Sequence, residues 1–239
     1  IRGSAQQLIW QSYYLLEETL EYEKPEAVVF NVLSMKYDTP QKEAYNRMTL
    51  DGMKWSKSKV DDIRASMMED EEFADYVFPI LRYHSRWQEL TSDDFKYLFT
   101  RRPVSQSGYY MRIDVKPAQT FPKPKKLANY EFGENSWKYL EKMRKLCEEK
   151  GIQLILVKAP SLYPAWYDEW EDQIEEYAKT YELPYYNFLE LTDEVGIDFT
   201  KDTYDGGLHL NLSGAEKMGA YFGKILREEF QVPDRRNDE

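Results

Sequence analysis

The chain has 239 residues and a formal net charge of -11 at pH 7, because 43 acidic residues oppose 32 basic ones. This negative balance argues against a nucleic-acid backbone or an anionic membrane surface as the main partner. A single cysteine excludes an intrachain disulfide, and the two histidines lie too far apart in sequence to form a cluster of metal ligands. We therefore expect no metal and no other cofactor.

The first half of the chain has the pattern of a helix, a strand and a long helical insertion. Apolar residues recur at helical spacing over 5–22, and the apolar run over 27–33 is typical of a buried parallel strand. A second helical pattern, with two breaks, covers 40–100. We expect a single domain, 1–239, with an insertion over 40–130 that forms a helical cap above one edge of the sheet.

Strands and helices alternate in the second half. The pattern predicts helices over 136–150, 166–181 and 213–230, and strands over 152–157 and 185–188. The proline-rich stretch before them shows no period. Alternation of this kind implies parallel strands joined by right-handed crossovers. The sequence therefore predicts an α/β fold in which helices cover both faces of a parallel sheet, a three-layer α/β/α sandwich.

The strongest chemical signal lies between the last predicted strand and the last predicted helix. Asp205 stands four residues before His209, with two glycines between them. A carboxylate that accepts the Nδ1 proton of an imidazole fixes its tautomer and leaves Nε2 to act as a general base. We expect this pair at the carboxyl edge of the sheet, where parallel sheets hold their ligands. Asp202 and Asp198 are alternative carboxylates on the same loop.

Three segments together resemble the SGNH, or GDSL-like, hydrolase superfamily. The segments are Gly3-Ser4-Ala5-Gln6-Gln7 at a helix start, Leu156-Val157-Lys158-Ala159-Pro160 at a strand end, and Asp205 followed by His209-Leu210-Asn211 and Gly214-Ala215. The likeness covers about residues 1–35 and 130–232. It is strongest to the cell-envelope branch of Gram-positive bacteria, which is similar to the proteins of teichoic-acid D-alanylation and alginate O-acetylation.

The resemblance implies a flavodoxin-like sheet and the triad of a serine esterase or acyltransferase. It matches Asp205 and His209 to the acid and the base, although the family usually places two residues between them and this chain has three. It also matches Gly3 to a backbone N–H donor of the oxyanion hole. The asparagine that serves the same oxyanion would fall near Asn31, where the surrounding family pattern is absent.

The family's nucleophilic serine ends the first strand, upstream of the block that contains Gly3. We therefore expect an N-terminal piece to precede Ile1. It would contain the serine, and a signal or anchor would lie in the same piece. Ser4 is the alternative nucleophile, although only three residues precede it to support a strained turn. The flavodoxin-like order places the first strand inside the sheet. The slot beside the 27–33 strand should then be empty, or filled by a strand from outside residues 1–239.

Together these observations predict an SGNH-type serine esterase or acyltransferase that acts on an acylated carbohydrate or a small acyl ester of an envelope or extracellular glycan. The resemblance implies an extracytoplasmic bacterial protein that meets the membrane only through the missing piece. The alternative is a non-catalytic glycan-binding or assembly protein with the same fold. Tyr163, Trp166 and Trp170 either line the pocket mouth or pack within a helix, and His84 either reaches over the pocket or lies on a helix surface.

Overall fold

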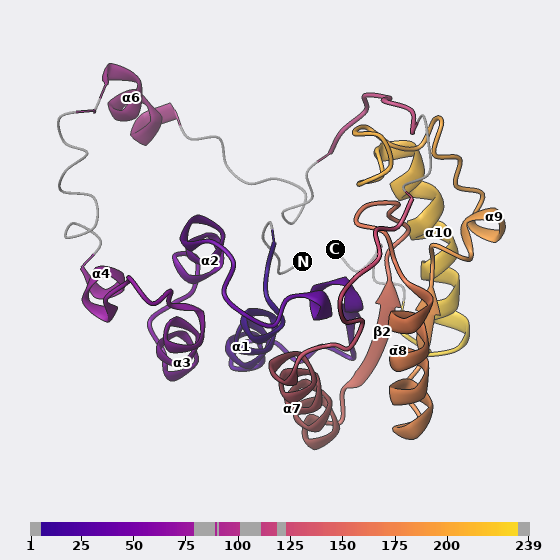
Figure 1. Cartoon of the computed structure of the whole chain (residues 1–239), viewed down its shortest axis with the longest axis horizontal. Helices are drawn as coiled ribbons and strands as arrows, with labels where there is room; N and C mark the ends of the chain where they lie inside the picture. The colour runs from indigo at the N-terminus through magenta and orange to yellow at the C-terminus, as the bar shows by residue number, and fades with distance from the viewer. Residues whose placement is uncertain (1–5, 79–88, 90, 101–110, 119–122, 234–239) are drawn as a thin grey trace. The chain divides into compact units, whose positions relative to one another are not determined.

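The structure is a computed structural model, in which the chain forms two compact units (Figure 1). The helical unit comprises Ile1–Glu23 and Tyr37–Tyr110, and the sheet unit comprises Lys24–Lys36 and Met111–Glu239. The residues that the structure describes are 6–78, 89, 91–100, 111–118 and 123–233. The predictions for Gly3, Ser4 and His84 lie outside these described residues.

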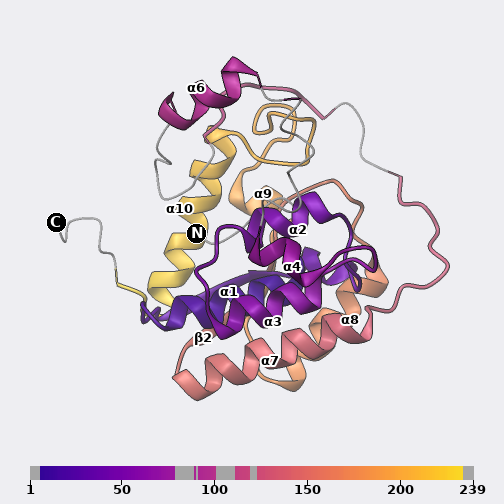
Figure 2. The ribbon, with the colours of Figure 1, turned by 90° about the vertical axis from the view of Figure 1, so that its left-hand side faces the viewer.

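The helical unit contains α1 (Ile9–Leu20), α2 (Glu43–Leu50), α3 (Lys57–Ser66), α4 (Phe73–Val77) and α6 (Ser92–Thr100). Helices α1, α2 and α3 lie close together in Figures 1 and 2. Trp10 of α1 donates its indole N–H to Ser66 Oγ of α3 at 2.9 Å. The same serine donates to Asp62, a fully buried residue of α3. This unit therefore has its own buried core with a polar group inside it.

The sheet unit contains three parallel strands, β1 (Ala27–Asn31), β2 (Gln153–Lys158) and β3 (Tyr185–Asn187), in the order β1-β2-β3. The predicted α/β class with a parallel sheet is confirmed. The first strand is shorter than expected, because the chain turns after Asn31 into the 3₁₀ helix η1 (Val32–Lys36). The apolar residues at the start of η1 are buried, which explains why they extended the strand-like run.

The helices of the sheet unit match the predicted helices to within about two residues at most ends. They are α7 (Glu134–Lys150), α8 (Asp168–Thr180), α9 (Thr192–Val195) and α10 (Leu212–Glu228). The short α9 was not predicted. Helix α7 ends at Gly151, whose φ of 67° lies in the left-handed region that favours glycine. The buried face of α7 carries the lone cysteine, Cys147.

Helix α10 packs against one face of the sheet. Successive strand residues point to opposite faces, so Ile155 and Val157 of β2 share a face. They belong to a buried cluster with Phe188 that extends into the segment before α10. The partly buried apolar residues that cover this cluster from α10 are Met218, Tyr221, Phe222 and Leu226. Burial of this face holds α10 against the sheet.

Strand β1 lies at an edge of the sheet. Within the described residues it pairs with β2 only, so its other edge carries unpaired backbone N–H and C=O groups. Val29, in the middle of this apolar strand, is 45% exposed. Whether the slot beside this strand is empty or takes a strand from outside residues 1–239 stays a prediction.

Candidate functional site

The predicted acid and base lie in residues 204–209, which we call the acid–base loop. Thr203 and Leu210 form an antiparallel bridge that closes the loop at its base. Gly206 and Gly207 have φ angles of 85° and 102°. Glycine adopts these angles without the steric penalty of a Cβ atom. The two glycines therefore allow the chain to reverse within six residues and bring the two ends of the loop together.

Asp205 and His209 form the predicted hydrogen bond, with 2.6 Å between Oδ2 and Nδ1. The other carboxylate oxygen, Oδ1, accepts the backbone N–H groups of His209 at 2.8 Å and Leu208 at 3.2 Å. Burial raises the pKa of Asp205, but these hydrogen bonds outweigh it, and the pKa lies below its usual value. An ionised Asp205 thus holds the imidazole with its proton on Nδ1.

The opposite edge of the His209 ring is open. Its side chain is 59% exposed, and no described residue makes a hydrogen bond with Nε2. The ring of Tyr204 stacks on the imidazole, with centroids 5.7 Å apart and planes 6° apart. The Arg112 guanidinium in turn lies over the Tyr204 ring at 5.0 Å. The stack fixes the plane of the imidazole and leaves Nε2 accessible to a substrate or a nucleophile.

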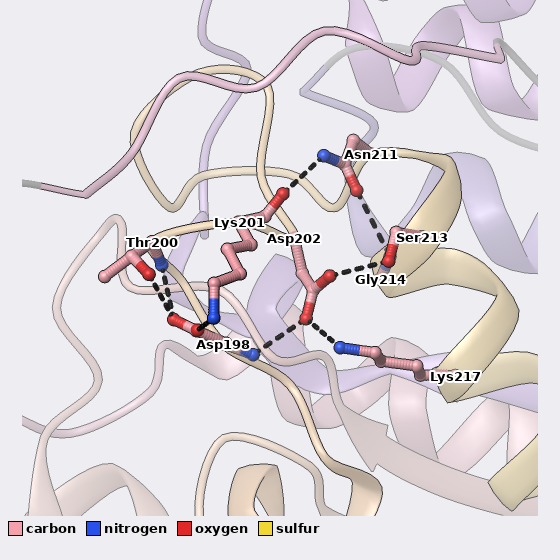
Figure 3. A network of polar contacts seen from close by, with 8 residues as sticks. All are labelled: Asp198, Thr200, Lys201, Asp202, Asn211, Ser213, Gly214 and Lys217. Atoms are coloured by element: carbon pink, nitrogen blue, oxygen red, sulfur yellow. Dashed lines mark hydrogen bonds and ion pairs between the residues drawn. The ribbon is translucent and has the colours of Figure 1, made fainter.

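The two alternative carboxylates have other partners (Figure 3). Asp202 is 1% exposed, and its Oδ1 accepts the Ser213 hydroxyl at 2.8 Å. Its Oδ2 accepts Lys217 Nζ at 2.6 Å and the Asp198 backbone N–H at 2.8 Å. The Asp198 carboxylate pairs with Lys201 at 3.0 Å. Of the three carboxylates, only Asp205 is bonded to His209.

The network around Asp202 fastens the acid–base loop to α10. Asn211 caps the helix, because its Oδ1 accepts the Gly214 N–H at 3.2 Å. The side-chain N–H of Asn211 donates to the Lys201 carbonyl at 2.8 Å (Figure 3). A Cβ atom at Gly214 would lie 2.6 Å from the Asp202 carbonyl oxygen, so only glycine permits this close approach. The Ser213 hydroxyl donates to the Asp202 carboxylate and takes no part in the cap.

An extended segment, residues 111–118, supports the other side of the loop. The Lys116 N–H donates to the Thr203 carbonyl at 2.9 Å, and the Lys116 carbonyl accepts the Gly206 N–H at 3.0 Å. The same segment carries Arg112, the residue above Tyr204. Sequence reasoning missed this support, because backbone groups make the hydrogen bonds and the segment has no apolar period. Arg112 has no sequence signal that could have identified it.

The turn after β2 also contacts the acid–base loop. The fully buried Lys158 donates to the Ala159 carbonyl at 2.6 Å and to the Ser161 hydroxyl at 3.2 Å. Burial lowers the pKa of Lys158 to about 8. The Leu162 N–H then donates to the Gly207 carbonyl at 2.7 Å. Because this turn follows the carboxyl end of β2, the acid–base loop lies at the predicted edge of the sheet.

Asn31 lies at the same edge, where β1 ends. Its Oδ1 accepts the backbone N–H groups of Leu33 at 3.2 Å and of Ala159 at 3.4 Å. Its side-chain N–H groups have no partner among the described residues. Asn31 and the acid–base loop therefore border the same turn after β2, while the described structure shows no direct hydrogen bond between Asn31 and His209.

The aromatic residues after β2 divide into two kinds. Trp170 is buried and stacks on Phe132 at 5.6 Å, so it packs within the fold. Trp166 is half-buried and donates its indole N–H to the buried Glu171. Tyr163 is exposed. Of the three residues considered for a pocket mouth, Trp170 therefore packs inside the fold and does not line a pocket mouth.

Neither the described residues nor the comparisons with known proteins assign a further site or a family to this chain. Among the described residues, no group of three or more His, Cys, Asp or Glu side chains could hold a metal ion. The helices that the structure describes include none long and apolar enough to cross a membrane. Comparisons with protein-family models, with curated proteins and with solved structures each found no match to this chain. The function of this chain is therefore inferred from the residues of the site.

Proposed function

We propose that Asp205 and His209 are the acid–base half of an SGNH-type serine site. The protein would be an esterase or acyltransferase that acts on an acyl ester of an envelope or extracellular glycan. The observation that carries this proposal is the 2.6 Å hydrogen bond to Nδ1 on an exposed imidazole whose Nε2 edge is open. The flavodoxin-like sandwich and the extracytoplasmic location belong to the same proposal and rest on the resemblance.

In this reaction His209 Nε2 removes the proton of a serine hydroxyl as its oxygen attacks the ester carbonyl carbon. Asp205 keeps the Nδ1 proton in place and stabilises the positive charge that develops on the imidazole. The tetrahedral intermediate then loses the glycan oxygen, which receives the proton from Nε2. Water or an acceptor hydroxyl next attacks the acyl-serine, with His209 as the base again, and the serine is released.

One feature at the end of β1 supports a further part of this site. The side-chain N–H of Asn31, which has no partner among the described residues, suits an oxyanion donor. The resemblance offers Gly3 as the second donor. Loss of one such donor commonly lowers kcat by about 10²–10³. The nucleophile is proposed to follow a strand that pairs with this edge, because no serine that the structure describes is bonded to His209.

The test is ester hydrolysis by the protein expressed from its full reading frame. With p-nitrophenyl acetate as the substrate, His209→Ala should lower kcat/KM by roughly 10²–10⁴-fold while the far-UV circular dichroism spectrum stays unchanged. His84→Ala is the matched control, because these are the only two histidines. Unchanged turnover in His209→Ala refutes the assignment of the base.

The second candidate is a non-catalytic glycan-binding or assembly protein. One observation favours this alternative: no serine that the structure describes lies in hydrogen-bond contact with His209 Nε2. A fluorophosphonate probe distinguishes the two candidates, because it reacts with an activated serine. Covalent labelling that disappears in His209→Ala supports the enzyme. An unlabelled protein that hydrolyses no ester supports the binding protein.

A further inference from the structure

An open groove of about 350 Å³ lies along α7 and α8, which run side by side. Its lining includes three aromatic residues, Trp137, Tyr177 and Tyr181, and two acidic residues, Glu131 and Glu176. No residue of the acid–base loop lines it. The groove is therefore a second concave surface of the sheet unit, with a composition of its own.

The three rings form a continuous aromatic surface. The centroids of Trp137 and Tyr177 are 5.3 Å apart, with their planes at 35°. The centroids of Tyr177 and Tyr181 are 4.7 Å apart, because the two tyrosines are four residues apart on one helix face. Tyr181 is 41% exposed. The surface thus runs from the first turn of α7 to the end of α8 and is open to solvent at that end.

Polar contacts behind the rings hold them in place. The Tyr177 hydroxyl donates to Glu141 at 3.0 Å, and Arg144 donates to the same carboxylate at 2.7 Å. The hydrogen bond from Arg144 lowers the pKa of Glu141 to about 2, so the pair is charged at neutral pH. The Arg144 guanidinium also lies over the Tyr181 ring at 4.4 Å. Rings that are fixed before binding lose less side-chain entropy when a ligand arrives.

The groove also offers both hydrogen-bond donors and acceptors. Within the described residues no partner is bonded to the indole N–H of Trp137, the hydroxyls of Thr180 and Tyr181, or the carboxylates of Glu131 and Glu176. A ligand anion would meet two carboxylates and no lining cation. An organic cation would use the rings and the carboxylates but would leave the N–H and O–H donors unpaired.

We propose that this groove binds a saccharide. A sugar has apolar C–H faces that stack on aromatic rings, and hydroxyls that both donate to carboxylates and accept from N–H and O–H groups. It is the ligand class that uses the aromatic rings, the carboxylates and the N–H and O–H donors of the lining together. The oligosaccharide would lie along Trp137, Tyr177 and Tyr181, with its hydroxyls toward Glu131 and Glu176. This inference rests on the groove alone and does not depend on the acid–base pair.

The test follows the indole N–H signals of the ¹⁵N-labelled full chain by NMR during titration with chitopentaose, cellopentaose and maltopentaose. The chain has six tryptophans, and Trp137→Phe identifies the signal of Trp137 by its loss. At least one of the three sugars should shift this signal to saturation. Tyr181→Ala should weaken that binding about tenfold or more, and Glu176→Gln should also weaken it. Tyr22→Ala, at another exposed tyrosine, should not.

Three results would overturn the saccharide assignment. One is that none of the three sugars moves the Trp137 signal. Another is that a sugar binds equally well to Tyr181→Ala and to the unchanged chain. The third is that choline saturates the signal while the sugars do not, because the groove would then select a cation. His209→Ala should bind the sugar as the unchanged chain does, so that loss of ester hydrolysis and loss of sugar binding are separate outcomes.

Discussion

Gly207 holds the acid–base loop in a shape that residues with a side chain cannot reproduce. Its φ is 102°, and a Cβ atom at this position would lie 2.7 Å from Leu162 Cδ1. The Gly207 carbonyl accepts the Leu162 N–H, so the loop cannot move away without losing that bond. Gly206 also has a positive φ, but the nearest atom to its Cβ position is the Pro117 carbonyl oxygen at 4.0 Å. The two glycines thus differ in packing but share their backbone constraint.

This difference predicts unequal effects of two alanine substitutions. Gly207→Ala should lower the free energy of unfolding by about 2–4 kcal/mol, because backbone strain and overpacking add. Gly206→Ala should lower it by only about 1 kcal/mol, since strain acts alone. Urea unfolding followed by circular dichroism measures both values. Equal losses would show that the Leu162 side chain can move away from the added methyl group at little cost in free energy.

Asp62 predicts a pH-dependent stability in the helical unit. Burial raises the pKa of Asp62 to about 7, and among the described residues only its Oδ1 has a hydrogen-bond partner, Ser66. The folded state therefore binds the proton more tightly than the unfolded state, whose aspartate titrates at about 3.9. Stability is then highest below the unfolded pKa and falls as the pH rises toward 7.

Asp62→Asn removes this charge, so it should raise the free energy of unfolding at pH 8 by an amount on the order of a few kcal/mol. The gain should shrink steadily as the pH falls, and it should disappear at about pH 3 and below, where Asp62 is largely protonated in both the folded and the unfolded state. Thermal unfolding over this pH range measures the gain. Asp61→Asn is the control, because the neighbouring Asp61 is half-exposed and its carboxylate is paired with Lys57. A gain that stays constant with pH would contradict the raised pKa.

Contacts between residues close in sequence could be predicted, whereas contacts between residues that only the fold brings together could not. Asp205 and His209 are four residues apart, so the glycine turn alone indicates that they meet. Lys158 lies within a segment named in the sequence analysis, and Tyr204 directly precedes Asp205. Their roles depend on the turn after β2 and on the plane of the imidazole, which only the folded chain defines. The sequence identified the pair but not its supports.

At the scale of elements, the start of α10 is fixed by one buried carboxylate. Burial raises the pKa of Asp202, but hydrogen bonds from Asp198, Lys217 and Ser213 outweigh it and lower the pKa below its usual value. The stabilisation from these partners is therefore present at neutral pH. It is lost as the pH falls through the folded pKa.

Lys217→Met tests this role of Asp202. It should lower the free energy of unfolding by about 2 kcal/mol at pH 7, because a hydrogen bond to a buried charge is lost. The loss should decrease at acidic pH as Asp202 becomes protonated. Lys224→Met on the same helix is the control, because Lys224 forms an exposed ion pair with Glu228 at 3.9 Å. Loss of this pair should lower the free energy of unfolding by less than about 0.5 kcal/mol. Equal effects at the two positions would contradict the buried network.

Elements with a clear period were predicted, and elements held by backbone contacts were not. The pattern before Gly151 identified α7, because an apolar stripe and a glycine cap are both local signals. The segment 111–118 has neither signal, since its backbone bonds to the acid–base loop can form with any side chain. The turn η1 was read as strand because its buried apolar residues continue the run of β1. Such a run does not distinguish a strand from a short buried helix.

For the whole molecule, helical periodicity identifies helices but does not indicate which helices pack together. Helix α1 packs with α3, although β1 lies between them in sequence. The boundaries of the two units follow from such contacts and not from composition. The net charge of -11, by contrast, is a property that the sequence alone determines.

That charge predicts no affinity for nucleic acid. At about 0.15 M salt surface charges are screened beyond roughly 8 Å, and over the whole chain 43 acidic residues oppose 32 basic ones. The full chain should leave the electrophoretic mobility of double-stranded DNA unchanged, and lowering the salt should not create binding. A complex that tightens at low salt would reveal a basic surface that the overall charge conceals.

Cys147 has a consequence for oxidation chemistry. It lies on the inner face of α7, and burial raises the pKa of its thiol to about 11. The reactive thiolate is therefore scarce and inaccessible while α7 stays packed. In an oxidising compartment the native protein would then resist disulfide-linked dimers despite its unpaired cysteine. Because the sequence contains no other thiol, the rate at which a thiol reagent modifies the protein would report how often α7 opens.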